Sequence, residues 1–162
     1  MKELEAVSKI RVFLKEEGFI VPKKPLQEFY SNIVRLSGLG IGGILHMSGK
    51  KAGKIAGNLL KDIMGPGESS VEEIELYLKV FLEEAGICRV KSWEHVDGLI
   101  RLRIEGSVFA EGQESKKPVC IPLQGALAGV LEELTGKRWE CKELECEAQG
   151  KDSCLFELRV EK

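Results

Sequence analysis

Three cysteines and one glutamate in the last third of the sequence are the residues best suited to chemistry. Cys120 stands alone, Glu143 and Cys146 form a Glu-x-x-Cys pair, and a seven-residue segment then leads to Cys154. Thiolates and carboxylates bind divalent metal ions, and four such ligands complete the tetrahedral coordination of zinc. The spacing by itself leaves two interpretations open, a closed structural metal site or a group of buried, unreactive cysteines.

The segments around these residues predict how they would be positioned. Residues 139–144 and 154–160 alternate in hydropathy as strands do, and residues 118–134 have the spacing of a helix that Gly136 would end. A hairpin of the two strands would bring the glutamate and the last two cysteines to one end. A helix that begins near Cys120 would then place the fourth ligand beside them.

The two other cysteines have different predicted environments. Cys141 lies two residues before Glu143, on the same face of the expected strand, and is the rival ligand. Cys88 lies between apolar neighbours and is predicted to belong to the core. Because the cytosol keeps thiols reduced, five cysteines without a secretion signal favour metal binding or burial over disulfides.

The rest of the chain predicts helices followed by a β-hairpin. Ser70 and Glu73 form a capping box, Asp97-Gly98 is typical of a hairpin turn, and Pro22 and Pro25 indicate a connector. Together these signals predict an α+β fold in which helices pack on an antiparallel sheet. The predicted helices cover residues 2–15, 41–63 and 70–85, and the predicted hairpin strands cover residues 87–93 and 99–105.

Glycine and alanine recur at three- and four-residue spacing between residues 38 and 57. Small residues at this spacing let a second helix approach closely, so we expect a helix built for close packing, although each interior glycine costs up to about 1 kcal/mol. Gly38-x-Gly40-x-x-Gly43 also matches a dinucleotide-binding fingerprint, and Asp62 follows at the required distance. That interpretation is disfavoured, because Asp62 would end a helix where the fingerprint needs the end of a strand.

The composition excludes several classes of function. A net charge of −2 leaves no basic surplus to neutralise nucleic-acid phosphates. No apolar run reaches the length of a membrane span, and the first residues indicate an amphipathic helix instead of a signal peptide, so we expect a cytoplasmic protein. The two histidines have no serine or cysteine partner with motif support, so no residue is predicted to be catalytic.

The segment from Cys120 to Leu158 resembles the C-terminal signature of the 4-vinyl-reductase domain family. That signature consists of a cysteine at the start of a glycine-rich helix, a Glu-x-x-Cys pair, an Ala-x-Gly loop and a Cys-x-Phe strand. Upstream of this segment, the resemblance rests on the glycine-rich helix and the order of the elements. The matching residues are Cys120, Glu143, Cys146, Ala148, Gly150, Cys154 and Phe156.

The resemblance implies a sensor-like α+β domain, usually a homodimer, with an internal pocket for a hydrophobic molecule. A matching set of ligands binds zinc in related aromatic-sensor domains, which implies a C-terminal zinc-bound hairpin here. The implied ligands of this structural zinc are Cys120, Glu143, Cys146 and Cys154. The implied single domain spans residues 1–162, with an N-terminal helix and connector in residues 1–25 and the core in residues 26–162.

Three functions are compatible with this resemblance. The leading hypothesis is a stand-alone domain that binds a hydrophobic, aromatic or acyl small molecule and has a structural zinc site. The alternatives are a reductase or reductase subunit acting on a vinyl group of a tetrapyrrole, and a structural assembly subunit. Recognition of phenol is not carried over, because Glu105 replaces the aromatic residue expected before Ser107. The candidate ligand-binding residues are His46, Trp93 and Phe109.

Overall fold

The computed structural model describes residues 1–36 and 40–161, which form five α-helices and a four-stranded sheet. The predicted α+β class is therefore confirmed. The helices are α1 (Lys2–Glu17), α2 (Lys23–Leu36), α3 (Ile41–Met64), α4 (Val71–Glu84) and α5 (Ile121–Thr135). The strands are β1 (Arg89–Val96), β2 (Leu99–Glu105), β3 (Trp139–Glu145) and β4 (Cys154–Val160), and a short 3-10 helix covers Glu147–Gln149.

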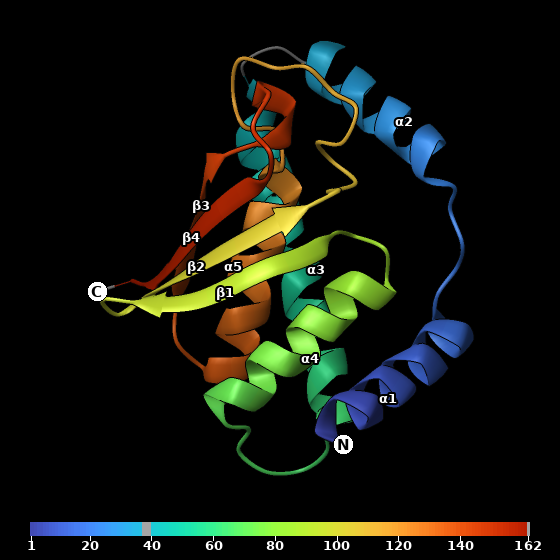
Figure 1. The fold of residues 1–162 in the computed structure, drawn as a ribbon, viewed down its shortest axis with the longest axis vertical. Helices are drawn as coiled ribbons and strands as arrows, with labels where there is room; N and C mark the ends of the chain where they lie inside the picture. Colours follow the sequence, from blue (N-terminus) through green and yellow to red (C-terminus); the bar gives the residue numbers. More distant parts are fainter. Residues whose placement is uncertain (37–39, 162) are drawn as a thin grey trace.

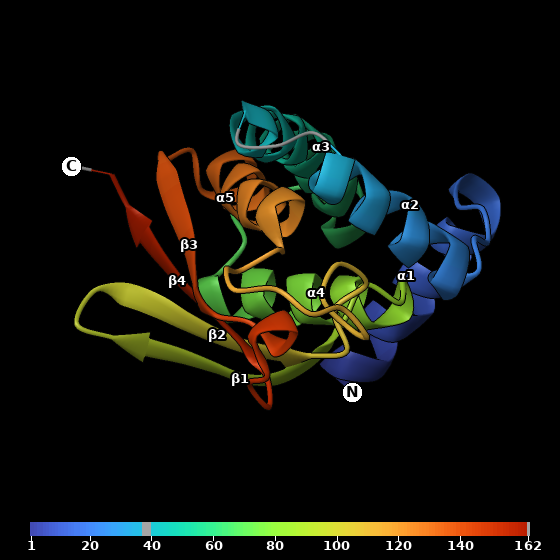
Figure 2. The same ribbon diagram turned by 90° about the horizontal axis from the view of Figure 1, so that it is seen from above.

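The sheet has the order β1-β2-β4-β3, and every neighbouring pair is antiparallel, so β1 and β3 are its edge strands. On one face, α5 packs against β3 and α4 against β1 (Figure 1). Beyond this layer, α3 lies on α5 and α1 lies on α4 (Figure 2). The core between helices and sheet is apolar, and its fully buried side chains include Leu78, Leu102, Leu127, Phe156 and Leu158.

Local signals in the sequence set several element boundaries where they are predicted. The hydroxyl of Ser70 accepts a hydrogen bond from the Glu73 N–H (3.2 Å) at the start of α4. Gly136 ends α5 in the left-handed conformation, with φ of 68°. Asp97 and Gly98 have φ of 49° and 79°, and two consecutive positive values are what a two-residue hairpin turn requires.

Helices α3 and α5 pack backbone against backbone, which confirms the predicted close packing. A Cβ atom at Gly53 would collide with the carbonyl oxygen of Ala126, and one at Gly129 would collide with that of Lys50. The seam therefore has no room for side chains at these positions, which offsets the low helix propensity of glycine. Although α3 has 24 residues, no helix among the described residues is both long and apolar enough to cross a membrane.

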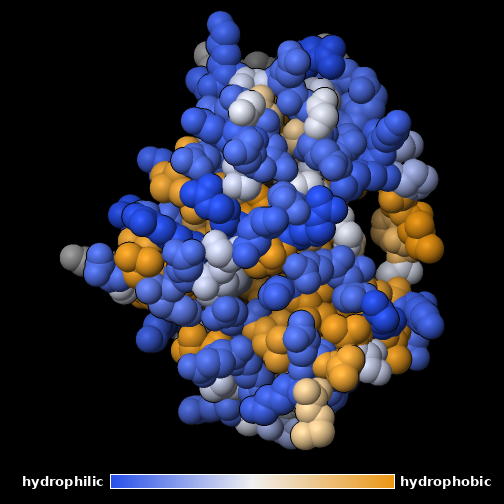
Figure 3. Space-filling view, in the orientation of Figure 1, coloured by the Kyte–Doolittle hydropathy of each residue, from blue (hydrophilic) through white to orange (hydrophobic). Residues whose placement is uncertain are grey.

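Helix α2 differs from the prediction of a connector around Pro22 and Pro25. The helix begins at Lys23, and Pro25 lies in its first turn, where a missing N–H breaks no helical hydrogen bond. The connector is thus confined to residues 18–22, which are apolar, exposed and visible at the right-hand edge of Figure 3.

The position of α2 also bears on the dinucleotide fingerprint. That motif needs a strand before its glycines, whereas residues 1–36 form helices and contain no strand. Gly38 lies outside the described residues. Gly40 and Gly43 lie at the start of α3, so the glycines of this region serve a helix.

Candidate functional site

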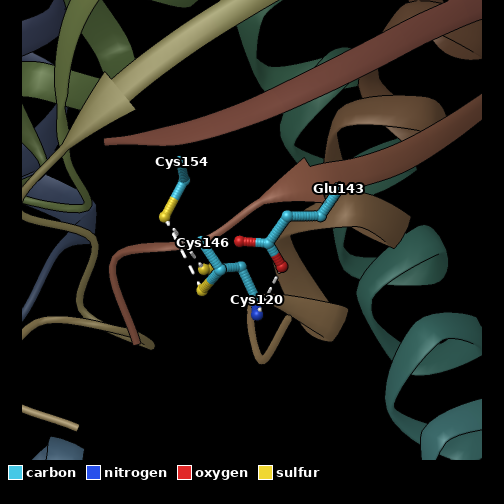
Figure 4. Close-up of side chains that lie close together, drawn as sticks. All are labelled: Cys120, Glu143, Cys146 and Cys154. Atoms are coloured by element: carbon cyan, nitrogen blue, oxygen red, sulfur yellow. Dashed lines mark hydrogen bonds between the residues drawn. The ribbon is translucent and has the colours of Figure 1, made fainter. Parts of the chain in front are cut away.

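The four candidate metal ligands come from separate chain segments that meet at one end of the sheet (Figure 4). Cys120 precedes α5, Glu143 lies on β3, Cys146 precedes the 3-10 helix, and Cys154 begins β4. One ligand atom from each residue lies within 4.8 Å of the others, and all four residues are buried. Cys141, the rival ligand, is buried on β3 but is not part of this cluster.

The geometry of the cluster fits a tetrahedral metal ion. The sulfur of Cys154 lies 3.9 Å from that of Cys120 and 3.8 Å from that of Cys146. Zinc–sulfur bonds of about 2.3 Å at tetrahedral angles place two sulfurs about 3.8 Å apart. Glu143 accepts the Cys120 N–H through Oε2 (2.9 Å), while its buried Oε1 has no hydrogen-bond partner among the described residues. A bound cation would satisfy this oxygen.

The electrostatics of these acidic groups also favour a cation. Burial raises the pKa of Glu143 to about 8, and hydrogen bonds with Cys146 and Cys154 raise the pKa of the Cys120 thiol well above its usual value. Hydrogen bonds from Cys120 and Cys154 lower the pKa of Cys146 to about 2. Neighbouring like charges oppose ionisation, so the four groups can all be ionised only around a positive ion. Cys88, outside the cluster, is a core thiol whose pKa burial raises to about 12.

A second feature lies at the opposite end of α5. A cavity of about 260 Å³ lies between α4, α5 and the β1–β2 hairpin. Trp139 donates its indole N–H to the hydroxyl of Thr135 (2.8 Å), but the buried indole N–H of Trp93 has no acceptor among the described residues. The cavity therefore combines apolar walls with one unused donor. Its apolar lining residues include Ile74, Trp93, Ile100, Leu131, Trp139 and Val160.

The three candidate ligand-binding residues do not share one cavity. Trp93 lines the apolar cavity. His46 lines a more polar groove beside the edge strand β3, and Phe109 packs its ring edge-on against Tyr30, with ring centroids 5.0 Å apart. His46 and Phe109 therefore lie away from the apolar cavity.

Helix α2 closes the metal end of the molecule, which the sequence patterns did not indicate. The buried Tyr30 donates its hydroxyl to the carbonyl oxygen of Val119, immediately before Cys120. Lys23 pairs with Glu111 (2.6 Å) in the loop that leads to α5. The signal that was available is the helical spacing of apolar residues between residues 26 and 34.

Comparison with protein families gives the class of this chain. Residues 100–160, which contain β2, α5, β3, β4 and all four candidate ligands, match the model of the 4-vinyl-reductase domain. The resemblance to this family is thereby confirmed for this part of the chain. An uncharacterized protein of Methanocaldococcus jannaschii is 43% identical over 44 residues, and the match spans 27% of this chain and 27% of that protein.

Solved structures share the fold over most of the chain. The phenol-responsive sensory domain of the transcription activator PoxR, solved with phenol, has a TM-score of 0.70, 20% identity, and coverage of 88% of this chain and 76% of that one. A vinyl-4-reductase family protein of Methanocaldococcus jannaschii has a TM-score of 0.64 and 20% identity, with 98% and 92% covered. Trafficking protein particle complex subunit 3 of Naegleria fowleri, covalently bound to palmitic acid, has 0.65 and 18%, with 86% and 95% covered.

Proposed function

We propose that this chain is a small-molecule-binding domain of the sensor type, in which a structural zinc ion holds the C-terminal hairpin to α5. The observation that carries the proposal is the apolar cavity with its unused indole N–H. Small-molecule sites are typically concave and apolar, with a few polar groups that orient the ligand. Relatives of the same fold that were solved with phenol and with palmitic acid support an apolar ligand.

Zinc suits the donor set of the metal cluster. Thiolate ligands favour zinc over magnesium and calcium, which prefer oxygen, and zinc also accepts a carboxylate. The protein would fill all four positions of a tetrahedral ion and leave none for water or substrate, so the ion would be structural. It would join the start of α5, the end of β3 and the start of β4, which are far apart in the sequence.

We also infer a homodimer, in keeping with the family resemblance. Phe19 and Ile20, between α1 and α2, are 85% and 98% exposed, and Ile44, Met47 and Ile55 on α3 are also exposed. Exposed apolar clusters of this kind mark interaction surfaces. A cytoplasmic location is part of the same proposal, because all five cysteines are free thiols, the form that a reducing compartment maintains.

Two matched probes test the ligand proposal. Cyclohexanone carries a hydrogen-bond acceptor, and methylcyclohexane has a similar size but no acceptor. Both tryptophans of the chain line the cavity, so their indole N–H resonances report its occupancy. We expect cyclohexanone to move the Trp93 resonance more than that of Trp139, whose N–H already has an acceptor. No movement of either resonance with either probe would overturn the proposed site.

Elemental analysis of the purified protein tests the zinc proposal. The natural chain should contain about one zinc per chain, and the Cys146→Ser and Cys154→Ser variants should lose it. The control is Cys88→Ser, which changes a buried thiol outside the cluster and should retain the metal. Natural protein that is well folded and free of metal would refute the zinc site.

A further inference from the structure

The hydroxyl of Ser107 contacts the metal cluster from outside the ligand set. Ser107 follows β2, is fully buried, and places its Oγ 3.3 Å from the sulfur of Cys120. The N–H of Phe109 donates to the same oxygen (3.3 Å). Since the oxygen accepts from Phe109, its own proton is free, and a thiolate at Cys120 can only accept. The hydroxyl therefore donates to the sulfur.

Other hydrogen bonds to the cluster come from the backbone. The Glu147 N–H donates to the sulfur of Cys154 (3.3 Å), and the Cys120 N–H donates to Glu143 (2.9 Å). Apart from the cysteines themselves, Ser107 is the only residue in the described part of the chain whose side chain donates to a ligand sulfur. Its substitution would therefore remove a donor without changing a ligand.

The carboxylate of Glu147 holds Ser107 in place. It accepts the N–H groups of Gly106 (2.9 Å) and Ser107 (3.3 Å). Gly106 has φ of 64°, a left-handed conformation that turns the chain at the end of β2. Because Glu147 also follows Cys146 and bonds to Cys154, it ties the end of β2 to the loop that carries two candidate ligands.

We propose that Ser107 is a positioning residue for the metal centre, which orients the sulfur of Cys120 by donating to it and thereby raises the affinity for zinc. The proposal rests on the proposed zinc site. Three thiolates and one carboxylate bring four negative charges to an ion with two positive charges. A donor to sulfur offsets part of this excess, and such outer partners also fix the orientation of the ligand.

The test compares Ser107→Ala with Ser153→Ala. Ser153 is also buried and precedes a candidate ligand, but its hydroxyl bonds to Arg103 and to none of the sulfurs. Loss of an outer partner typically weakens metal binding about 10- to 100-fold. We expect Ser107→Ala to weaken zinc binding by this factor in competition with a chromogenic chelator, and Ser153→Ala to leave it unchanged.

Cobalt(II) gives a second readout, because sulfur-to-cobalt charge-transfer bands respond to hydrogen bonding at the sulfur. The bands should change in Ser107→Ala and return in Ser107→Thr, which keeps the hydroxyl. If Ser107→Ala does not fold, Glu147→Gln serves in its place and should weaken zinc binding in the same direction. Equal zinc affinity and equal cobalt spectra for the natural and variant proteins would overturn the role of Ser107 alone. Natural protein that binds neither ion would instead refute the zinc site.

Discussion

The two ends of α5 carry opposite kinds of site. At the N-terminal end, Cys120 belongs to a buried polar cluster in which the donors and acceptors are paired, apart from one oxygen of Glu143. At the C-terminal end, Leu131 borders an apolar cavity where the N–H of Trp93 is unused. The first end suits a small ion that stays, and the second suits an apolar molecule that exchanges. One helix can thus anchor a fixed centre while it forms the wall of an adaptable one.

The largest effect should follow from breaking the metal end. We expect Cys154→Ala to lower the free energy of unfolding by about 4 kcal/mol or more, because loss of a structural metal frees three chain segments at once. Cys88→Ala removes a buried thiol outside the cluster and should cost about 1 to 2 kcal/mol. Denaturant unfolding at a fixed concentration of free zinc measures both values. Similar losses in the two variants would contradict a special role for the cluster.

An intermediate effect should come from the seam that holds α5 between its two ends. In Gly53→Ala, the new methyl group meets the carbonyl oxygen of Ala126, so we expect a loss of about 2 to 3 kcal/mol. Gly43, also in α3, has open space around an added Cβ, and Gly43→Ala should gain up to about 1 kcal/mol from helix propensity. Thermal unfolding distinguishes the two. A neutral Gly53→Ala would disprove the backbone contact between α3 and α5.

The smallest effect should appear at the cavity end, where the two tryptophans differ in one hydrogen bond. Trp139→Phe removes the bond to Thr135 and should cost about 1 kcal/mol more than Trp93→Phe, which removes a donor that has no acceptor among the described residues. Denaturant unfolding without added ligand measures the difference. A greater loss in Trp93→Phe would mean that its N–H is already satisfied in the free protein.

Local patterns predicted much of this fold, because caps and turns are fixed by neighbouring residues. Ser70 and the Asp97-Gly98 turn are examples, and both lie where they were expected. Helix α2 was not predicted, because Pro25 was interpreted as part of a connector although a first helical turn accepts proline. The proline pattern alone does not distinguish these two cases.

The candidate site was predictable only in part, since its contacts cross long distances in the sequence. The predicted hairpin does gather Glu143 and the cysteines at one end, although the metal itself remains a proposal. Hydropathy indicates that His46 and Phe109 are partly buried but not which surface each faces. The bonds of Glu147 to Gly106 and Ser107 span about 40 residues, and no local pattern indicates them.

The seam between α3 and α5 has a mechanical consequence. Side chains at an ordinary helix interface can absorb a small displacement by changing rotamers, but main-chain atoms have no rotamers to change. At Gly53 and Gly129, carbonyl groups of one helix rest directly on the backbone of the other. A displacement of α5 at either end must therefore carry α3 with it, together with the exposed Ile44 and Met47. The joint between the two helices is a coupling without play.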